Sequence, residues 1–175
     1  RGVVAASAGN HAQGVALAAR ELGIKAKIFM PVGASLPKVS ATKGYGAEVV
    51  LTGDTFADCL KAAKEYSEKK HAVFIPPFDH IDVVIGQGTV GLEIMQEQPE
   101  VDNIVVAIGG GGLAAGVAVV AKLMAKANGR KVKVYGVQSE HAAPYVTSLK
   151  KGKLTEVPTT PTIADGIAVS KPGRI

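Results

Sequence analysis

The sequence has no tryptophan, only one cysteine and few aromatic residues of any kind. A single cysteine, Cys59, excludes a disulfide within the chain and favours a reducing compartment, so we expect a cytoplasmic protein. Cys59 stands in a stretch of helical composition, where a small buried side chain is a commoner role than a nucleophile. At 5% aromatic content, the chain lacks the stacking platform that a single-strand nucleic-acid binder needs.

Long runs of one charge are also missing. The formal net charge is +5, but the basic residues are spread along the chain, which is typical of a solvated surface and predicts no nucleic-acid partner. The uncharged run over residues 104–121 is interrupted by four consecutive glycines, so it predicts strand, loop and helix rather than a membrane span. No secretory signal is found, and no His, Cys, Asp or Glu cluster has metal-ligand spacing, so we expect no metal.

What the sequence does contain is a regular alternation of two kinds of segment. Short runs rich in β-branched residues predict parallel strands at residues 3–7, 27–31, 48–52, 72–77, 104–109 and 133–138. Between them, segments of helical length and composition predict helices at residues 11–22, 36–45, 55–70, 83–96, 113–127 and 142–150. This order predicts an α/β fold of parallel-sheet βαβ units with right-handed crossovers.

Three boundaries have recognisable chemistry. Gly23 suits the left-handed stop of the first helix, and Asp54, Thr55 and Asp58 can cap the start of the third. Pro76-Pro77 and the loop-like residues after them predict a division into two lobes, residues 1–80 and 81–175.

The strongest candidate for a binding element is a glycine loop between a predicted strand and a predicted helix. Consecutive glycines let backbone N–H groups surround an anion, and the N-terminus of the following helix adds positive potential. Phosphate is the natural ligand, although a tight turn without a ligand is the plainer alternative. The residues are Gly109, Gly110, Gly111, Gly112 and Leu113.

A dinucleotide is a poorer fit to the same loop. The third glycine of the dinucleotide fingerprint would fall on Ala115, and the acidic residue that should follow, Glu140, lies too far along the chain. A nicotinamide-dependent dehydrogenase therefore stays as a remote alternative.

A second small-residue turn follows the first predicted strand. Free N–H groups of the first helical turn, together with serine and asparagine side chains, can hold a carboxylate or a phenolate. An N-cap followed by small, closely packing residues would look the same, so this element is ambiguous taken alone. The candidate residues are Ser7, Ala8, Gly9, Asn10 and His11.

Four segments together carry a resemblance to a known family. They are Ser7-Ala-Gly-Asn-His-Ala-Gln-Gly14, Ile85-Gly-Gln-Gly-Thr-Val-Gly-Leu-Glu93, Gly109-Gly-Gly-Gly-Leu113 and Ala164-Asp-Gly166. In this order, and over essentially the whole chain, they resemble the pyridoxal-phosphate (PLP) threonine dehydratases, the threonine/serine ammonia-lyases of the tryptophan-synthase-β fold.

The resemblance implies a two-lobed homo-oligomeric enzyme, a dimer or tetramer, with PLP between the lobes. Gly109–Gly112 and Leu113 would bind the cofactor phosphate, Asn10 the ring hydroxyl oxygen, and the turn Ser7–His11 the substrate carboxylate. Gly166 would lie near the cofactor, with Asp165 supporting that loop. The implied reaction is β-elimination, which converts threonine or serine to a 2-oxo acid and ammonia in a biosynthetic or catabolic pathway.

The chain departs from the family pattern in what it does not contain. The Schiff-base lysine of the family stands in a Ser-Phe-Lys-x-Arg-Gly motif upstream of the Ser7 element, and no lysine here has that context. We therefore expect an internal fragment of a longer enzyme that has no catalytic lysine and is inactive by itself. A non-catalytic binding remnant is the alternative.

Two positions bear on the choice within the family. Serine racemases, which resemble this chain, carry a second serine where Ala8 stands and a carboxylate metal ligand near the position of Gln138. Both features are missing, so the sequence favours a dehydratase over a serine racemase.

Overall fold

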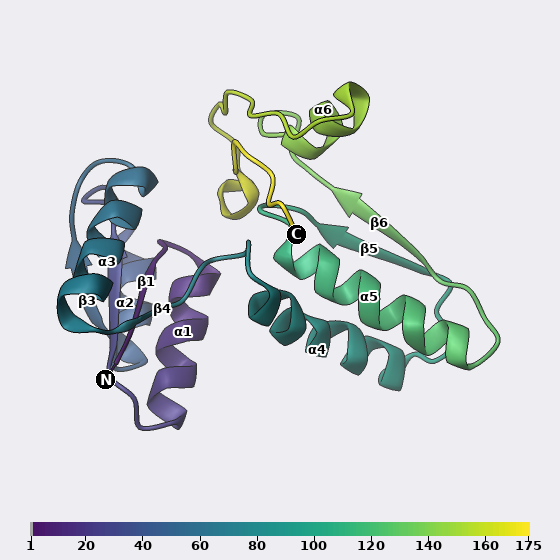
Figure 1. Ribbon diagram of the computed structural model, residues 1–175, viewed down its shortest axis with the longest axis horizontal. Helices are drawn as coiled ribbons and strands as arrows, with labels where there is room; N and C mark the ends of the chain where they lie inside the picture. The colour runs from purple at the N-terminus through teal and green to yellow at the C-terminus, as the bar shows by residue number, and fades with distance from the viewer. Residues whose placement is uncertain (1) are drawn as a thin grey trace. The chain divides into compact units, whose positions relative to one another are not determined.

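The computed structural model describes residues 2–175, which form two compact units, one up to Pro77 and one from Phe78 onward. Figure 1 shows the two sets of helices and strands. Each unit is described by itself below.

The first unit is a parallel four-stranded sheet with helices on both faces. The strand order is β3-β2-β1-β4, and every neighbouring pair is parallel. The strands are β1 (Val3–Ala6), β2 (Ala26–Met30), β3 (Glu48–Leu51) and β4 (Val73–Phe74). The helices are α1 (Asn10–Glu21), α2 (Leu36–Gly44) and α3 (Phe56–Lys70).

Alternate residues of β1 and β2 point to opposite faces and build two separate cores. On one face, Ala5, Ile28 and Met30 pack with α1 and α2 against a row of buried alanines, Ala12, Ala16 and Ala19. On the other face, β1 and β2 pack against α3 through Val4, Ala6, Phe29, Cys59 and Ala63. Small side chains therefore let the helices lie close to the sheet.

The predicted helix boundaries in this unit are largely confirmed. Gly23 has a φ of 65° just after Leu22, the C-cap of α1, as predicted for a left-handed stop. Thr55 and Asp58 form a reciprocal capping box at the start of α3. The Thr55 hydroxyl also donates to the Asp58 carboxylate, and this hydrogen bond lowers the pKa of Asp58. The side chain of Asp54 is not part of the cap, because it is the Asp54 backbone N–H that donates to Asp58.

Cys59 is a core residue, as predicted. It is fully buried, its Sγ donates to the Thr52 carbonyl at 3.2 Å, and burial raises the pKa of its thiol.

The second unit contains a parallel pair of strands and a packed pair of helices. The pair is β5 (Asn103–Ala107) and β6 (Lys133–Val137). Helix α5 (Gly112–Ala127) packs on this pair, and α4 (Ile81–Glu97) packs against α5 (Figure 1). Helix α6 (Pro144–Lys151) and the short 3-10 turn η1 (Asp165–Ile167) complete the unit.

Glycines bring α4 and α5 into backbone contact. A Cβ on Gly116 of α5 would lie 2.5 Å from the Val84 carbonyl oxygen and 2.6 Å from the Gly88 nitrogen of α4. A Cβ on Gly91 would lie 2.9 Å from the Val117 carbonyl oxygen. Glycines 88 and 91 of the Ile85–Glu93 motif therefore have a structural role, the close approach of two helices.

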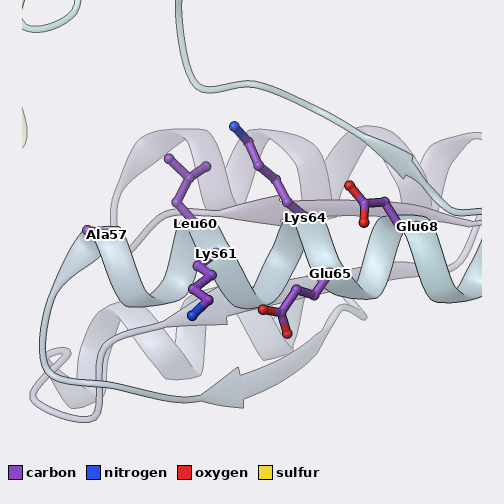
Figure 2. Close-up of a pocket in the computed structure, with 6 residues that line it drawn as sticks. All are labelled: Ala57, Leu60, Lys61, Lys64, Glu65 and Glu68. Carbon is purple, nitrogen blue, oxygen red and sulfur yellow. The ribbon is translucent and has the colours of Figure 1, made fainter.

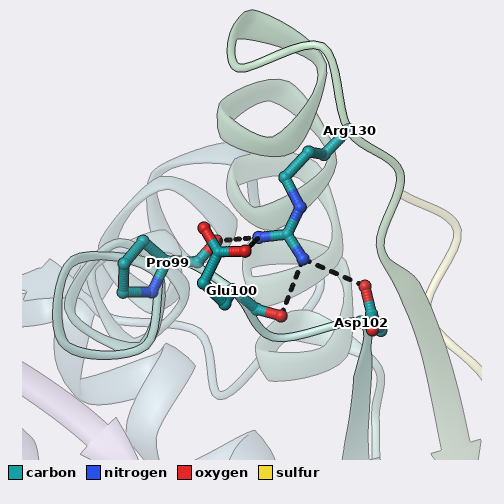
Figure 3. A network of polar contacts seen from close by, with 4 residues as sticks. All are labelled: Pro99, Glu100, Asp102 and Arg130. Carbon is teal, nitrogen blue, oxygen red and sulfur yellow. Dashed lines mark hydrogen bonds and ion pairs between the residues drawn. The ribbon is translucent and has the colours of Figure 1, made fainter.

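Arg130 ties together the two loops at the far end of this helix pair (Figure 3). Its guanidinium donates to the carbonyl oxygens of Pro99 and Glu100 and pairs with the Asp102 carboxylate at 3.1 Å. The loop after α4 and the loop after α5 are thus fixed to each other ahead of β5 and β6.

Two predictions about strands were wrong, one about the length of a strand and one about burial. The strand predicted over residues 72–77 is only Val73–Phe74, because Pro76 and Pro77 have no N–H to donate to a neighbour. Strands β5 and β6 were predicted to be buried, but Val105, Tyr135 and Val137 are about half exposed or more. Within the described residues, helix α5 covers only the face that carries Ile104 and Val106.

Candidate functional site

The glycine loop connects β5 to α5 and places a positive-φ glycine at the helix start. Gly111 is the N-cap of α5 with a φ of 105°, which L side chains rarely adopt, and Gly112 is the first helical residue. The first turn of α5 has no acidic residue. Because the first N–H groups of an α-helix have no partner within it, this turn presents donors to an external anion.

The loop has no room for side chains on its central residues. A Cβ on Gly110 would overlap the Phe78 ring, and one on Gly111 would overlap the Tyr145 hydroxyl. A Cβ on Gly112 would lie 3.1 Å from the Phe78 carbonyl oxygen. Glycine is therefore favoured by packing at Gly110, Gly111 and Gly112, and by backbone conformation at Gly111.

Two groups from outside the loop hold the Gly110 carbonyl in place. The Tyr145 hydroxyl donates to it at 2.7 Å, and the Gly173 N–H donates to it at 3.1 Å. The same Gly173 N–H lies 3.2 Å from the Tyr145 oxygen, so tyrosine, loop and chain end form one small network. Burial raises the pKa of Tyr145, which keeps its hydroxyl protonated and able to donate at neutral pH.

Asp79 extends this network toward the end of the chain. Its Oδ1 accepts hydrogen bonds from the backbone N–H groups of Arg174 at 2.7 Å and Ile175 at 3.2 Å. The segment that carries Gly173 is thereby held beside the glycine loop.

The second candidate element, in the first unit, is the turn between β1 and α1. Ser7 N–H donates to the Phe29 carbonyl, and the Ser7 hydroxyl accepts from the Gly9 N–H at 3.1 Å. Gly9 is the N-cap of α1, no side chain caps the helix, and its first turn has no acidic residue. The first-turn N–H groups, including those of Asn10 and His11, therefore have no partner within the helix and can bind a carboxylate.

His11 acts here as a neutral side chain. Its Nε2 lies 3.1 Å from the Ile75 carbonyl oxygen, which can only accept, so Nε2 carries the proton. Burial lowers the pKa of His11, so the imidazole is uncharged at neutral pH. Its contribution to anion binding would come from the backbone N–H and not from ring charge.

Of the residues singled out from the sequence, the structure brings Gly166 to the glycine loop. A Cβ on Gly109 would lie 3.7 Å from the Gly166 carbonyl oxygen and 3.3 Å from the Ile167 Cα. Asp165 is the first residue of η1, the turn that contains Gly166 and Ile167. The candidate phosphate-binding residues of the second unit therefore form one cluster, and residues 7–11 form another in the first unit.

Sequence reasoning missed the residues that enclose the glycine loop. Phe78, Asp79, Tyr145 and Gly173 are drawn from segments dozens of positions away, and no spacing or periodicity relates them to Gly109–Gly112. Only the folded backbone reveals them.

A shallow hollow elsewhere does not qualify as the site. It lies along α3 in the first unit, and the one helix supplies its lining: Ala57, Leu60, Lys61, Lys64, Glu65 and Glu68 (Figure 2). Its side chains point outward from the helix and include none of the predicted site residues.

Residues 2–175 contain neither a candidate metal site nor a candidate membrane span. No group of three or more His, Cys, Asp or Glu side chains is placed to hold a metal ion. No helix in this part of the chain is long and apolar enough to cross a membrane.

Comparisons with known proteins identify the family of the chain. Residues 1–175 match the family described as pyridoxal-phosphate dependent enzyme. The chain is 52% identical to L-threonine ammonia-lyase of Thermotoga maritima, over 100% of this chain and 43% of that protein.

Solved structures extend the likeness to the fold. Processed threonine deaminase isoform 2 from Solanum lycopersicum superposes with a TM-score of 0.90 at 43% identity, covering 99% of this chain and 47% of that one. Maize serine racemase superposes with a TM-score of 0.91 at 37% identity, covering 98% and 51%. The predicted α/β fold of the tryptophan-synthase-β type is thus confirmed, and the chain spans about half the length of the curated relatives it matches.

Proposed function

Because this chain belongs to the family of pyridoxal-phosphate dependent enzymes, we propose that the whole protein is a threonine ammonia-lyase. It would convert L-threonine to 2-oxobutanoate and ammonia, and L-serine to pyruvate and ammonia. The activity is assigned to the whole protein, since the 175 residues span about half of the relatives' length.

The observation that carries this proposal is the glycine loop at the start of α5. Its N-cap glycine has a φ of 105°, and neither Gly110 nor Gly111 has room for a Cβ. Such a loop fits the phosphate group of PLP, and the family match independently implies the same cofactor. When bound, PLP supplies the electron sink that makes the α-proton of an amino acid acidic.

The residues of this chain would bind and orient. Gly109–Gly112 and Leu113 would hold the phosphate through backbone N–H groups, with Gly166 beside them. In the first unit, the Ser7–His11 turn would hold the substrate carboxylate through the exposed N–H groups at the start of α1, and the Asn10 amide would donate to the ring hydroxyl oxygen.

Threonine elimination is favoured over serine racemisation by the surroundings of Gln138. Its Oε1 accepts from the Tyr145 N–H at 3.0 Å, and its Nε2 donates to the Ile108 carbonyl at 3.4 Å. A neutral amide so engaged takes the position near which racemases resembling this chain carry a carboxylate metal ligand. Ala8 likewise has no hydroxyl to donate a proton.

The test is the product spectrum of the purified whole protein with PLP. We expect 2-oxobutanoate from L-threonine, a lower rate of pyruvate formation from L-serine, and little D-serine. Racemisation of serine faster than deamination of threonine would overturn the assignment. Light scattering of the same sample checks the homo-oligomer that the resemblance implies.

For the 175-residue chain alone, we propose that turnover is absent, because none of its lysines stands in the Schiff-base motif of the family. Borohydride reduction of a PLP-loaded sample followed by intact mass measurement tests this. We expect a pyridoxyl adduct on the whole protein and an unmodified 17.9 kDa mass for the chain alone. A stoichiometric adduct on the chain alone, or its turnover of threonine, would contradict the proposal.

A further inference from the structure

Tyr145 reaches the glycine loop from a separate helix and makes a contact that the binding chemistry described above does not use. It stands in the first turn of α6, which begins at Pro144, far from the loop in sequence. Its hydroxyl donates to the Gly110 carbonyl at 2.7 Å. The side chain is partly buried, and its hydroxyl would be overlapped by any Cβ on Gly111.

The hydrogen bond to Gly110 fixes the direction of the next N–H group. In a trans peptide unit the N–H points opposite to the C=O, so holding the Gly110 carbonyl toward Tyr145 turns the Gly111 N–H away from it. Gly111 is the N-cap of α5. Its N–H therefore belongs with the donors that the start of α5 presents to an anion.

A glycine loop needs such an external restraint. Glycine populates positive and negative φ about equally, so a run of four has many competing conformations, and ordering them costs entropy. Tyr145 and Gly173 both donate to the same carbonyl and so restrict the freedom of the Gly110–Gly111 peptide.

We propose that Tyr145 is a positioning residue for the phosphate group of PLP, acting through the Gly110–Gly111 peptide. The proposal rests on the proposed function, since it takes the glycine loop to be the phosphate cradle. Loss of the hydroxyl alone should weaken binding of ligands that carry the phosphate and leave binding of ligands without it unchanged.

The experiment compares PLP with pyridoxal, which has the same ring and aldehyde but no phosphate. Affinities for the apo form of the whole protein are measured by equilibrium absorbance titration in wild type, Tyr145→Phe and Tyr135→Phe. Tyr135 is a half-exposed tyrosine on β6, and its variant is the matched control for loss of a phenol hydroxyl. The phosphorus-31 resonance of bound PLP gives a second readout that does not depend on turnover.

We expect Tyr145→Phe to weaken PLP binding roughly three- to tenfold, the effect of one hydrogen bond. Pyridoxal binding should stay unchanged, and the phosphorus-31 resonance should move toward that of free PLP. Tyr135→Phe should match wild type in all three measurements.

Three results would overturn the proposal, and they are distinguishable. Unchanged PLP affinity in Tyr145→Phe removes the positioning role while leaving the proposed function intact. Equal weakening for PLP and pyridoxal assigns Tyr145 a general structural role. Failure of the wild type itself to prefer PLP over pyridoxal contradicts the glycine loop as a phosphate cradle, and the role of Tyr145 with it.

Discussion

Gly111 and Gly129 both have positive φ, 105° and 68°, but they differ in what surrounds them. At Gly111 a methyl group would overlap the Tyr145 hydroxyl, whereas at Gly129 nothing lies within 4 Å. At the scale of the residue, an alanine at either position strains the backbone, but only the one at Gly111 also disturbs the candidate phosphate-binding loop.

We predict that Gly111→Ala weakens PLP binding by at least about tenfold. The alanine would strain the loop backbone by about 1.4 kcal/mol or more, and a loss of that size in binding free energy corresponds to a tenfold weaker affinity. Gly129→Ala should be strained to a similar degree and leave PLP affinity unchanged. Absorbance titration of both variants of the whole protein with PLP checks this prediction. Equal PLP affinities of the two variants would contradict a role of the glycine loop in PLP binding.

His11 predicts a pH dependence of stability. Its folded-state pKa is lowered from 6.5 by burial, so the unfolded chain binds a proton more readily. The stability contributed by the neutral, partly buried His11 is fully present above pH 6.5, and it is lost as the pH falls through the lowered folded-state pKa. Urea unfolding at pH 7 and pH 5 should show a larger acid loss for wild type than for His11→Gln. Parallel losses would contradict this assignment.

Some site residues could be predicted from the sequence, and others could not. Gly109–Gly112 and Ser7–His11 were recognisable because their signal is local, a small-residue run between a strand and a helix. Tyr145 and Phe78 were not, because their relation to the loop exists only after β5, α5 and α6 have packed.

At the scale of the element, helix α4 carries glycines of two kinds. Gly88 and Gly91 face α5, whereas a Cβ on Gly86 would meet nothing within 4 Å. These two kinds of glycine cannot be told apart from the sequence alone, because a glycine-rich helix is compatible with a binding motif and with a packing surface.

We predict that Gly116→Ala destabilises the protein by about 1–3 kcal/mol, because the added methyl meets the α4 backbone, which cannot move aside easily. Gly86→Ala should be neutral or stabilising by up to about 1 kcal/mol through helix propensity. Chemical denaturation of the two variants provides the measurement. An equal effect at both sites would mean that the helices are not in backbone contact.

At this scale the elements were predictable to within a few residues, and the exception is the end of β4. Each of the six strands and six helices lies where the alternation of the sequence places it, yet β4 is two residues long where six were expected. Prolines 76 and 77 were visible in the sequence, but how far a short strand pairs before a proline depends on its neighbour β1.

For the whole molecule, the fold was predictable because the resemblance covers the chain in order and the family match spans residues 1–175. The degree of burial was not, since periodicity reports which residues are apolar and not what covers them. Val105 is the clearest example, an apolar residue in a predicted buried strand that is 69% exposed.

The open face of β5 and β6 has a consequence for handling the 175 residues by themselves. Two strands are marginal as an independent sheet, and apolar side chains beside unpaired strand edges are templates for aggregation. We predict that the isolated chain precipitates or forms oligomers as its concentration rises. Val105→Lys should raise its solubility, and Val119→Lys, at an exposed position of α5, should raise it less. Static light scattering across a dilution series would decide this, and a monodisperse monomer at all concentrations would refute it.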